Sequence, residues 1–504
     1  MMELRHERLG GFRPVFNSLI RQEETLESIV PDALPDISRI IEVSGIAFLR
    51  QRETVDGSVR VMGTVRTTVL YLPEGGTAPC SLTLNIPYLC NGDHPSIREG
   101  CRTLASVNVI SADAQTVNPR KVLARIEIAV TVSIYAEDHE EICVNAEDSD
   151  DCGLQTLTEV HKDFIATDVV EKNFSFSDVL RLPASKPAVG QLLSSRVGLS
   201  CAEARVIGKK LVVKGEAALS VLYCCEDGVT AAKFDLPYSQ IMETHGGGED
   251  CDVKVEVMLT GISCELRSDS ELEVNLELLF QAAVRQEREV SLLADLYSIT
   301  EPVSAERGKV RLTTLVSQGA RRQIAQQFCP TTIPAKLVVD CRLTAGEVSQ
   351  ASAGEGTAML TAKTYADVLY LNGENELCTA SYVVPVTWEL PVPSGSQCAC
   401  KCSLVGEVTA VPVAGGLEVR FEAELSYRIT CSDEVGFVTA VRQEQTDTSS
   451  GERPSIVIRM VGEGERLWDV AKCCGSTVAD IQTVNSLVGG DAPSGTLLLI
   501  PKSR

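Results

Sequence analysis

The sequence contains no long apolar run. None of its hydrophobic segments approaches the roughly 20 consecutive residues that a membrane-spanning helix needs. Residues 1–8 are charged and lack the apolar core of a signal peptide. We therefore expect a chain without a transmembrane segment that stays in the cytoplasm.

Basic residues are too few to balance the acidic ones. The chain has 46 lysines and arginines against 69 aspartates and glutamates, which gives a formal net charge of −23. Such a charge repels phosphate backbones and anionic lipid surfaces. The composition therefore argues against nucleic acid as a partner.

Motifs for catalysis are missing as well. The five histidines are scattered, and the sequence has no Gly-x-Ser-x-Gly turn, no His-Glu-x-x-His helix and no Gly-x-x-x-x-Gly-Lys phosphate loop. Carboxylates are abundant, but abundance alone does not identify a glycosidase pair. We expect no enzyme, no catalytic residues and no cofactor.

Cysteine, by contrast, is abundant in this sequence. An odd number of cysteines, 19, in a chain without an export signal does not indicate a disulfide framework, and we interpret most as small core residues. Cys398, Cys400 and Cys402 would project from one face of a strand and could hold a soft metal. No Cys-x-x-Cys pair or nearby histidine completes a zinc set. We predict no metal site, and the role of this cluster stays open between core packing and metal binding.

Internal repeats decide the architecture, because 504 residues are too many for one hydrophobic core. Three apolar segments close on a Leu-Tyr pair, and prolines stand 36 and 40 residues before each tyrosine. Proline is about 5% of an average protein, so six matches at fixed offsets indicate duplication. The pairs are Leu70-Tyr71, Leu222-Tyr223 and Leu369-Tyr370, and the prolines are Pro31, Pro35, Pro183, Pro187, Pro330 and Pro334.

Each repeat continues with two further strand signals. An apolar segment containing Pro87, Pro237 or Pro385 follows the tyrosine, and an alternating apolar and polar segment closes the repeat at 124–135, 272–282 or 417–427. Alternation with period two predicts strands that have one buried and one wet face. Turn residues before these segments make them hairpins, so each repeat is a β-meander.

The predicted fold is therefore mainly β. Antiparallel strands with one apolar face favour a two-layer sandwich, with a flattened barrel as the alternative. A proline within a strand indicates an edge strand, which either protects against aggregation or is reserved for a partner strand. The predicted repeats are 24–141, 160–292 and 313–431, with linkers or long loops at 137–151 and 293–308 and a flexible tether at 443–454.

Residues 455–504 differ in character from the repeats. A strand at 456–461 precedes a helical pattern in which Leu467, Val470, Ala471 and Cys474 share one face. A second helix is predicted at 478–485 and a closing strand at 496–500, which gives the order β-α-α-β.

This order resembles the LysM domain over the whole segment. The resemblance implies an N-acetylglucosamine-binding groove between two loops, or the same groove used for a protein partner. The binding residues that it implies are Gly464, Glu465, Arg466, Trp468, Asn485 and Leu487. The residues that carry the resemblance are Gly464, Leu467, Trp468, Asp469, Val470, Ala471, Thr477, Val478, Ile481, Asn485, Leu487, Gly495, Leu497, Ile500 and Pro501.

One departure from the LysM pattern affects this groove. Glu465-Arg466 replaces the usual Asp-Thr, which removes a hydroxyl cap from the first helix at a cost of about 1 kcal/mol. Trp468 is either part of the core or a partly exposed platform for a sugar ring or a protein.

Three acidic β repeats followed by one LysM domain resemble the SPOCS-domain (SipL-like) spore coat proteins. The resemblance implies three β-sandwich-like SPOCS domains and a small LysM domain. It also implies a non-enzymatic scaffold in the mother cell that joins a SpoIVA-like coat protein at the forespore surface. The alternative is a wall- or cortex-associated protein that binds peptidoglycan or another N-acetylglucosamine-containing glycan.

Overall fold

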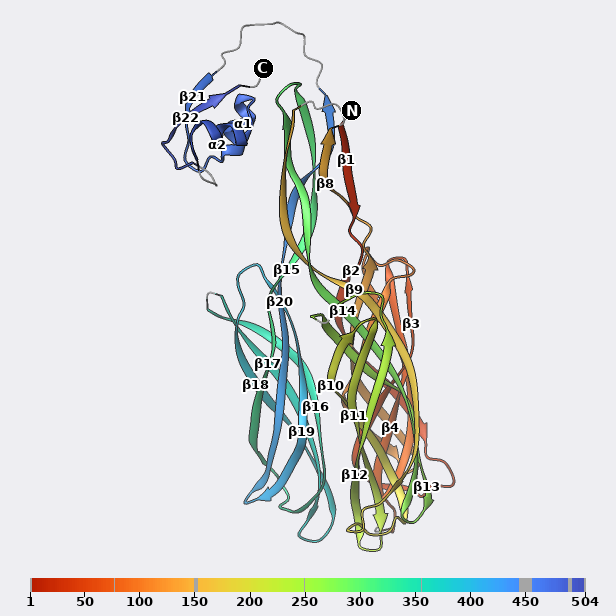
Figure 1. Cartoon of the computed structure of the whole chain (residues 1–504). Coiled ribbons are helices and arrows are strands. Elements are labelled where there is room, and N and C mark those ends of the chain that lie inside the picture. The colour runs from red at the N-terminus through yellow and green to blue at the C-terminus, as the bar shows by residue number, and fades with distance from the viewer. Residues whose placement is uncertain are drawn as a thin grey trace.

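The described residues of the computed structural model are mainly β, with two short helices near the C-terminus (Figure 1), which confirms the prediction of a mainly β fold. The predicted tether falls almost wholly outside the described residues. The structure describes residues 2–76, 78–148, 153–248, 250–354, 356–443, 456–487 and 492–502.

Three units of six strands follow one another along the chain. Unit 1 consists of β2 (Phe12–Ile29), β3 (Ile37–Val55), β4 (Ser58–Pro73), β5 (Cys80–Asp93), β6 (Arg102–Asn118) and β7 (Lys121–Glu137). Unit 2 consists of β9 (Leu154–Arg181), β10 (Gln191–Ile207), β11 (Lys210–Cys225), β12 (Gly228–Glu243), β13 (Asp252–Ser268) and β14 (Glu271–Ser298). Unit 3 consists of β15 (Val303–Pro330), β16 (Ala335–Gly354), β17 (Thr357–Asn372), β18 (Leu377–Pro391), β19 (Gln397–Val413) and β20 (Gly416–Gln443).

The strands have the same order in every unit. The three middle strands form one sheet, β3-β4-β5, β10-β11-β12 or β16-β17-β18. The first strand pairs with the last and the last with the fifth, which gives a second layer, β2-β7-β6, β9-β14-β13 or β15-β20-β19. Pro87, Pro237 and Pro385 lie on the edge strands β5, β12 and β18, as predicted.

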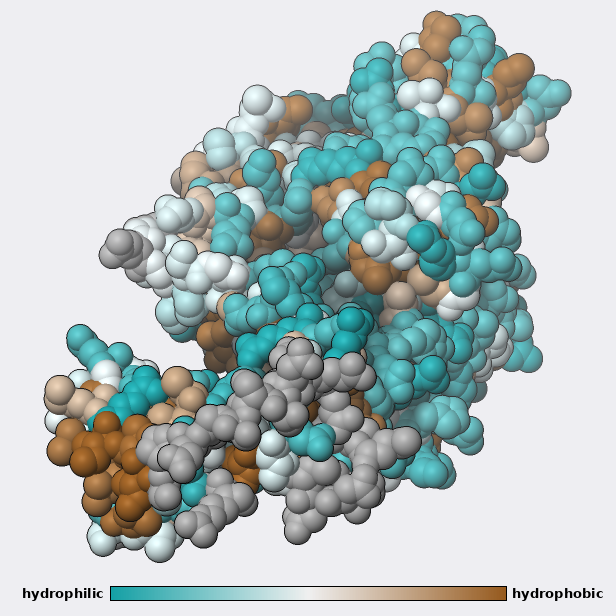
Figure 2. All heavy atoms as spheres, turned by 90° about the horizontal axis from the view of Figure 1, so that it is seen from above, coloured by the Kyte–Doolittle hydropathy of each residue, from teal (hydrophilic) through white to brown (hydrophobic). Residues whose placement is uncertain are grey.

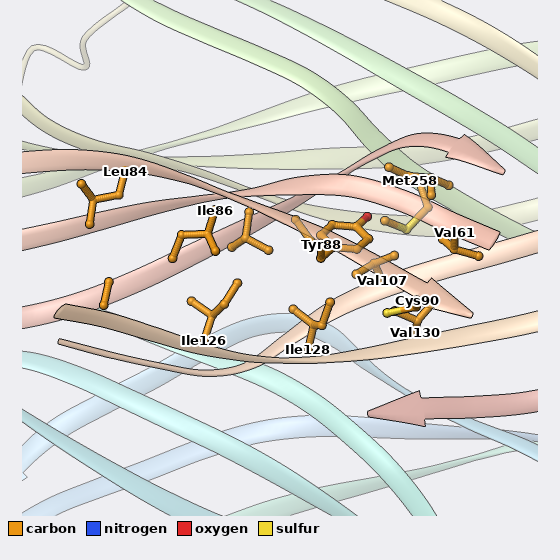
Figure 3. Packing of buried hydrophobic residues seen from close by; sticks show 14 of the residues in the cluster. Val61, Leu84, Ile86, Tyr88, Cys90, Val107, Ile126, Ile128, Val130 and Met258 are labelled. Atoms are coloured by element: carbon orange, nitrogen blue, oxygen red, sulfur yellow. The ribbon is translucent and has the colours of Figure 1, made fainter. Parts of the chain in front are cut away.

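A cluster of buried aliphatic side chains fills the space between the two layers of each unit. In unit 1, Ile86 and Tyr88 of β5 face Ile126 and Ile128 of β7 (Figure 3). The inward positions of β7 alternate with polar ones, which is the pattern that predicted a half-buried strand. Burial of these alternating faces holds the layers together.

The spacing between tyrosine and proline, which is the same in all three units, has a physical cause. The hydroxyl of Tyr71 donates a 3.0 Å hydrogen bond to the carbonyl of Pro35, and Tyr223 makes the same bond to Pro187. In unit 3 Tyr370 donates to the neighbouring carbonyl of Ile333 at 3.2 Å. Each bond ties the middle sheet to the turn that precedes it.

The leucine of each Leu-Tyr pair points the other way, because successive side chains of a strand face opposite sides of the sheet. Leu70, Leu222 and Leu369 meet in a single buried cluster between the three units. The motif therefore joins the units to one another as well as closing each unit.

Ion pairs reinforce this junction. Arg196 of unit 2 contacts Glu42 of unit 1 at 3.4 Å and also pairs with Asp340 of unit 3. A second connection involves the fully buried Asp163 of β9, which contacts Arg13 of unit 1 and accepts a hydrogen bond from the backbone N–H of Thr313 in unit 3.

Long paired strands project beyond the units. The outer ends of β9, β14, β15 and β20 surround an apolar cluster together with β1 (Met2–Arg8) and β8 (Glu141–Asp148), a strand pair of its own (Figure 1). The prediction of linkers at 137–151 and 293–308 is therefore wrong, because most of the described residues there belong to β8, β14 and β15. Exposed charged residues such as Glu141 and Glu306 alternate with buried apolar residues such as Ile142 and Leu296.

The C-terminal module has the predicted β-α-α-β order. Its two strands pair antiparallel, and both helices cover one face of this small sheet. The elements are β21 (Ile456–Met460), α1 (Leu467–Cys474), α2 (Val478–Val484) and β22 (Leu497–Pro501).

Candidate docking site on the C-terminal module

The entrance to α1 is closed by local hydrogen bonds. Gly464 makes the turn with a positive φ of 71°, and the Glu465 carboxylate accepts bonds from the Gly462 backbone at 3.0 Å and from Arg459 at 2.6 Å. In place of a hydroxyl cap, Asp469 accepts from the backbone N–H of Arg466 at 3.4 Å. The Arg466 side chain also donates to Asp469 and lowers its pKa. A carboxylate in the first turn is a favourable substitute for the missing cap.

Trp468 is buried against unit 2. Trp468 is only 9% exposed, and its Nε1 donates a hydrogen bond to the Asp295 carboxylate at 2.8 Å. The indole also meets the ring of Tyr297 edge to face, with ring centroids 4.9 Å apart. Asp295 and Tyr297 both lie on β14. The tryptophan that sequence reasoning left open between core and platform thus contacts a distant part of its own chain.

Asp295 is the centre of this contact. Lys472 donates to its two carboxylate oxygens at 2.7 and 2.8 Å, and Arg307 donates at 2.9 Å. Burial by itself would raise the pKa of Asp295, but the hydrogen bonds from Lys472, Trp468 and Arg307 outweigh it and hold the pKa below the usual range. The carboxylate is therefore charged at neutral pH.

Two further contacts complete the docking. The Tyr297 hydroxyl donates to the backbone carbonyl of Ser476 at 2.8 Å, and Arg466 lies 3.5 Å from Glu159 of β9. We call the group of Asp295, Tyr297, Trp468 and Lys472 the Asp295 latch. Of these four, the sequence analysis named only Trp468; it missed Lys472 and the two unit 2 residues, although one carboxylate within the apolar run 290–297 was a signal.

The second predicted loop has a structural role as well. The Asn485 amide donates to the carbonyl of Leu499 at 2.7 Å and accepts from its N–H at 2.8 Å, which fastens the end of α2 to β22. Leu487 packs, half-buried, on the module core. Of the six predicted residues, Gly464 and Arg466 are exposed, Glu465, Asn485 and Leu487 are half-buried, and Trp468 is buried.

A groove of about 530 Å³ opens between units 1 and 2. Two of its charged side chains are bonded within the chain: Asp168 accepts from Thr244 at 3.1 Å and from the His245 backbone at 2.7 Å, and Lys172 donates to the Ile241 carbonyl at 2.9 Å. The charges that line it have both signs, so the groove does not select a ligand charge.

The three clustered cysteines lie on one face of β19, as predicted, and pack against the core of unit 3. A hydrogen bond from Cys400 lowers the pKa of Cys398, whereas burial raises that of Cys402 to about 11. In the part of the chain that the structure describes, no three His, Cys, Asp or Glu side chains are grouped to hold a metal ion. Nor does any helix among the described residues have the length and apolar character to cross a membrane.

Comparison with known proteins identifies the middle of the chain. Residues 188–267, which run from β10 to β13 of unit 2, match the family model described as SipL, SPOCS domain. No curated protein and no solved structure matches the chain. The match therefore shows that unit 2 contains a segment similar to the SPOCS domain.

Proposed function

We propose that this chain is a non-enzymatic scaffold of the spore envelope that acts in the mother cell at the forespore surface. The observation that carries the proposal is the SPOCS match in unit 2. Units 1 and 3 repeat its strand order and its tyrosine hydrogen bond, which supports three SPOCS domains. Their buried junction makes them one body on which partners can assemble.

The C-terminal module is the docking element in this proposal. Its β-α-α-β order, together with the residues that resemble a LysM domain, supports a LysM identity. It binds a SpoIVA-like coat protein around the α1 entrance, where Gly464 and Arg466 are exposed beside Glu465. Asn485 and Leu487 form the second edge of this surface, and Trp468 becomes available when the Asp295 latch opens.

A protein partner is favoured over a glycan by the state of Trp468. It is the one aromatic residue between positions 456 and 504, and its ring packs on Tyr297. A sugar ring therefore finds no exposed aromatic face on which to stack while the latch is closed.

Capture of the partner from sporulating cells tests the proposal. The full chain should retain a SpoIVA-like protein, and the chain that ends at residue 455 should lose it. Arg466→Ala should weaken retention, whereas Lys502→Ala, which removes a cation elsewhere on the module, should not. Retention by the truncated chain would overturn the docking role and move the binding surface to the β units. Binding of the full chain to chitin oligomers without the coat protein would favour the glycan alternative.

A further inference from the structure

Among the residues that the structure describes, none covers the outer face of the sheet β21–β22, and its large side chains are all apolar. Its five large side chains are between 42% and 66% exposed, and the register pairs Ile458 with Leu499 and Met460 with Leu497 across the strands. Figure 2 shows a hydrophobic patch on this module. The five residues, which we call the β21–β22 face, are Ile456, Ile458, Met460, Leu497 and Leu499.

The inner face of the same sheet is already used. Leu498 and Ile500 are fully buried beneath the helices. An antiparallel sheet with one solvated face normally carries polar residues there, so aliphatic residues on both faces indicate a second contact. An exposed apolar patch on a folded protein marks an interaction site.

The chemistry of the β21–β22 face restricts what can cover it. The face offers no aromatic ring and no side-chain hydrogen-bond donor or acceptor, which a glycan would need. It carries no charge with which to hold a nucleic acid or a lipid headgroup. Its complement is therefore an apolar protein surface.

The distribution of charge favours a second copy of this chain as the occupant. Residues 456–504 contain five acidic and five basic residues, so the net charge of −23 belongs entirely to residues 1–455. The module is thus the part through which two copies can approach while their acidic units stay apart. A twofold axis beside the pair Ile458 and Leu499 would set apolar side chains against apolar side chains, because all five residues of the face are apolar.

The docked position of the module is compatible with this contact. Helix α1 carries the Asp295 latch, and the β21–β22 face lies on the side of the sheet away from the helices. We propose that two copies of the chain associate through their β21–β22 faces. This pairing does not depend on the identity of the coat partner.

The size of the face sets the strength of the pairing. A stable interface uses about 20–30 residues on each side, and the β21–β22 face has five. The isolated pairing is therefore weak and reversible, and it becomes effective where many chains are held on one assembly surface.

Sedimentation velocity of the full chain over a range of concentrations tests the proposal. We expect a reversible monomer–dimer equilibrium that strengthens with added salt, because screening reduces repulsion between the acidic units without weakening an apolar contact. Ile458→Glu and, separately, Leu499→Glu should each raise the dissociation constant by about tenfold or more. Val383→Glu is the matched control, since Val383 is also an aliphatic strand residue, 55% exposed, but lies on β18 of unit 3.

Circular dichroism should give the same spectrum for all three variants, which separates loss of pairing from loss of fold. A chain that stays monomeric at every concentration and salt level would overturn the proposal. An unchanged dimer in both module variants would overturn it too. If the wild type is monomeric and Ile458→Glu loses a protein captured from sporulating cells, the face belongs to a foreign partner and not to a second copy.

Discussion

The three β units and the C-terminal module are attached by different chemistry. The units meet through buried leucines, Leu70, Leu222 and Leu369, and through ion pairs of the half-buried Arg196. The module is held on unit 2 by hydrogen bonds that converge on the Asp295 carboxylate and by an apolar contact around Tyr297. Separation of the units would expose aliphatic surface and leave charges without partners, whereas water can replace the bonds of the latch. The difference indicates that the three units stay together permanently, whereas the C-terminal module can be released from unit 2.

The largest effect is expected from Arg196→Ala at the junction. The substitution leaves the buried Asp340 carboxylate and the half-buried Glu42 carboxylate without their cation, and removal of one partner from a buried ion pair costs about 3–5 kcal/mol. Urea unfolding should show the midpoint falling. Arg205→Ala is the control on the same strand, because its pair with Glu203 is exposed and contributes at most about 1 kcal/mol. Equal losses in the two variants would contradict a buried ionic junction.

Leu222→Ala tests the apolar part of the junction. A cavity among the leucines of three units should cost about 2–5 kcal/mol in the free energy of unfolding. Leu266→Ala, at an exposed position of unit 2, should change it by less than about 1 kcal/mol. A loss at Leu222 no greater than at Leu266 would mean that the units do not share this core.

Tyr223→Phe should have the smallest effect of the three. The ring stays in place but the Pro187 carbonyl loses its hydrogen bond, at a cost of about 0.5–1.5 kcal/mol measured by urea unfolding. Because the bond recurs in the other units, Tyr71→Phe and Tyr370→Phe should give losses of the same size. Three variants with wild-type stability would show that the repeated spacing has some other cause.

The sequence was informative about contacts within a repeat and uninformative about contacts between repeats. The fixed distance between tyrosine and proline predicted three similar β segments, and the alternation at 124–135 predicted a half-buried strand. By contrast, nothing local to Leu222 distinguishes a core residue of one unit from a residue shared by three. Charge was misleading at 137–151 and 293–308, because most of the described residues there belong to paired strands despite their acidic side chains.

The docking site was predicted in part. The turn at Gly464 and the missing hydroxyl cap were visible in the sequence, and the compensating role of Asp469 follows from its position three residues into the helix. The partner of Trp468 could not be predicted, because Asp295 lies 173 residues away along the chain. A contact between separate domains leaves no periodic signal in either of them.

The fluorescence of Trp468 tests the releasable latch most directly. The chain has two tryptophans, so Trp388→Phe leaves Trp468 as the one indole reporter. At neutral pH we predict blue-shifted emission that is protected from acrylamide. Asp295→Asn, which removes the charge that Trp468, Lys472 and Arg307 share, should shift the emission to the red and increase quenching.

Glu159→Gln, which removes only the peripheral contact with Arg466, should leave the Trp468 signal unchanged. The latch lowers the pKa of Asp295. Docking should therefore be strongest at pH values above the pKa of a free carboxylate, and it should be lost as the pH falls through the lowered pKa of Asp295. If the Asp295 carboxylate holds the C-terminal module on unit 2, Asp295→Asn should release the module without changing the circular dichroism spectrum. Equal protection of Trp468 with and without that carboxylate would contradict it.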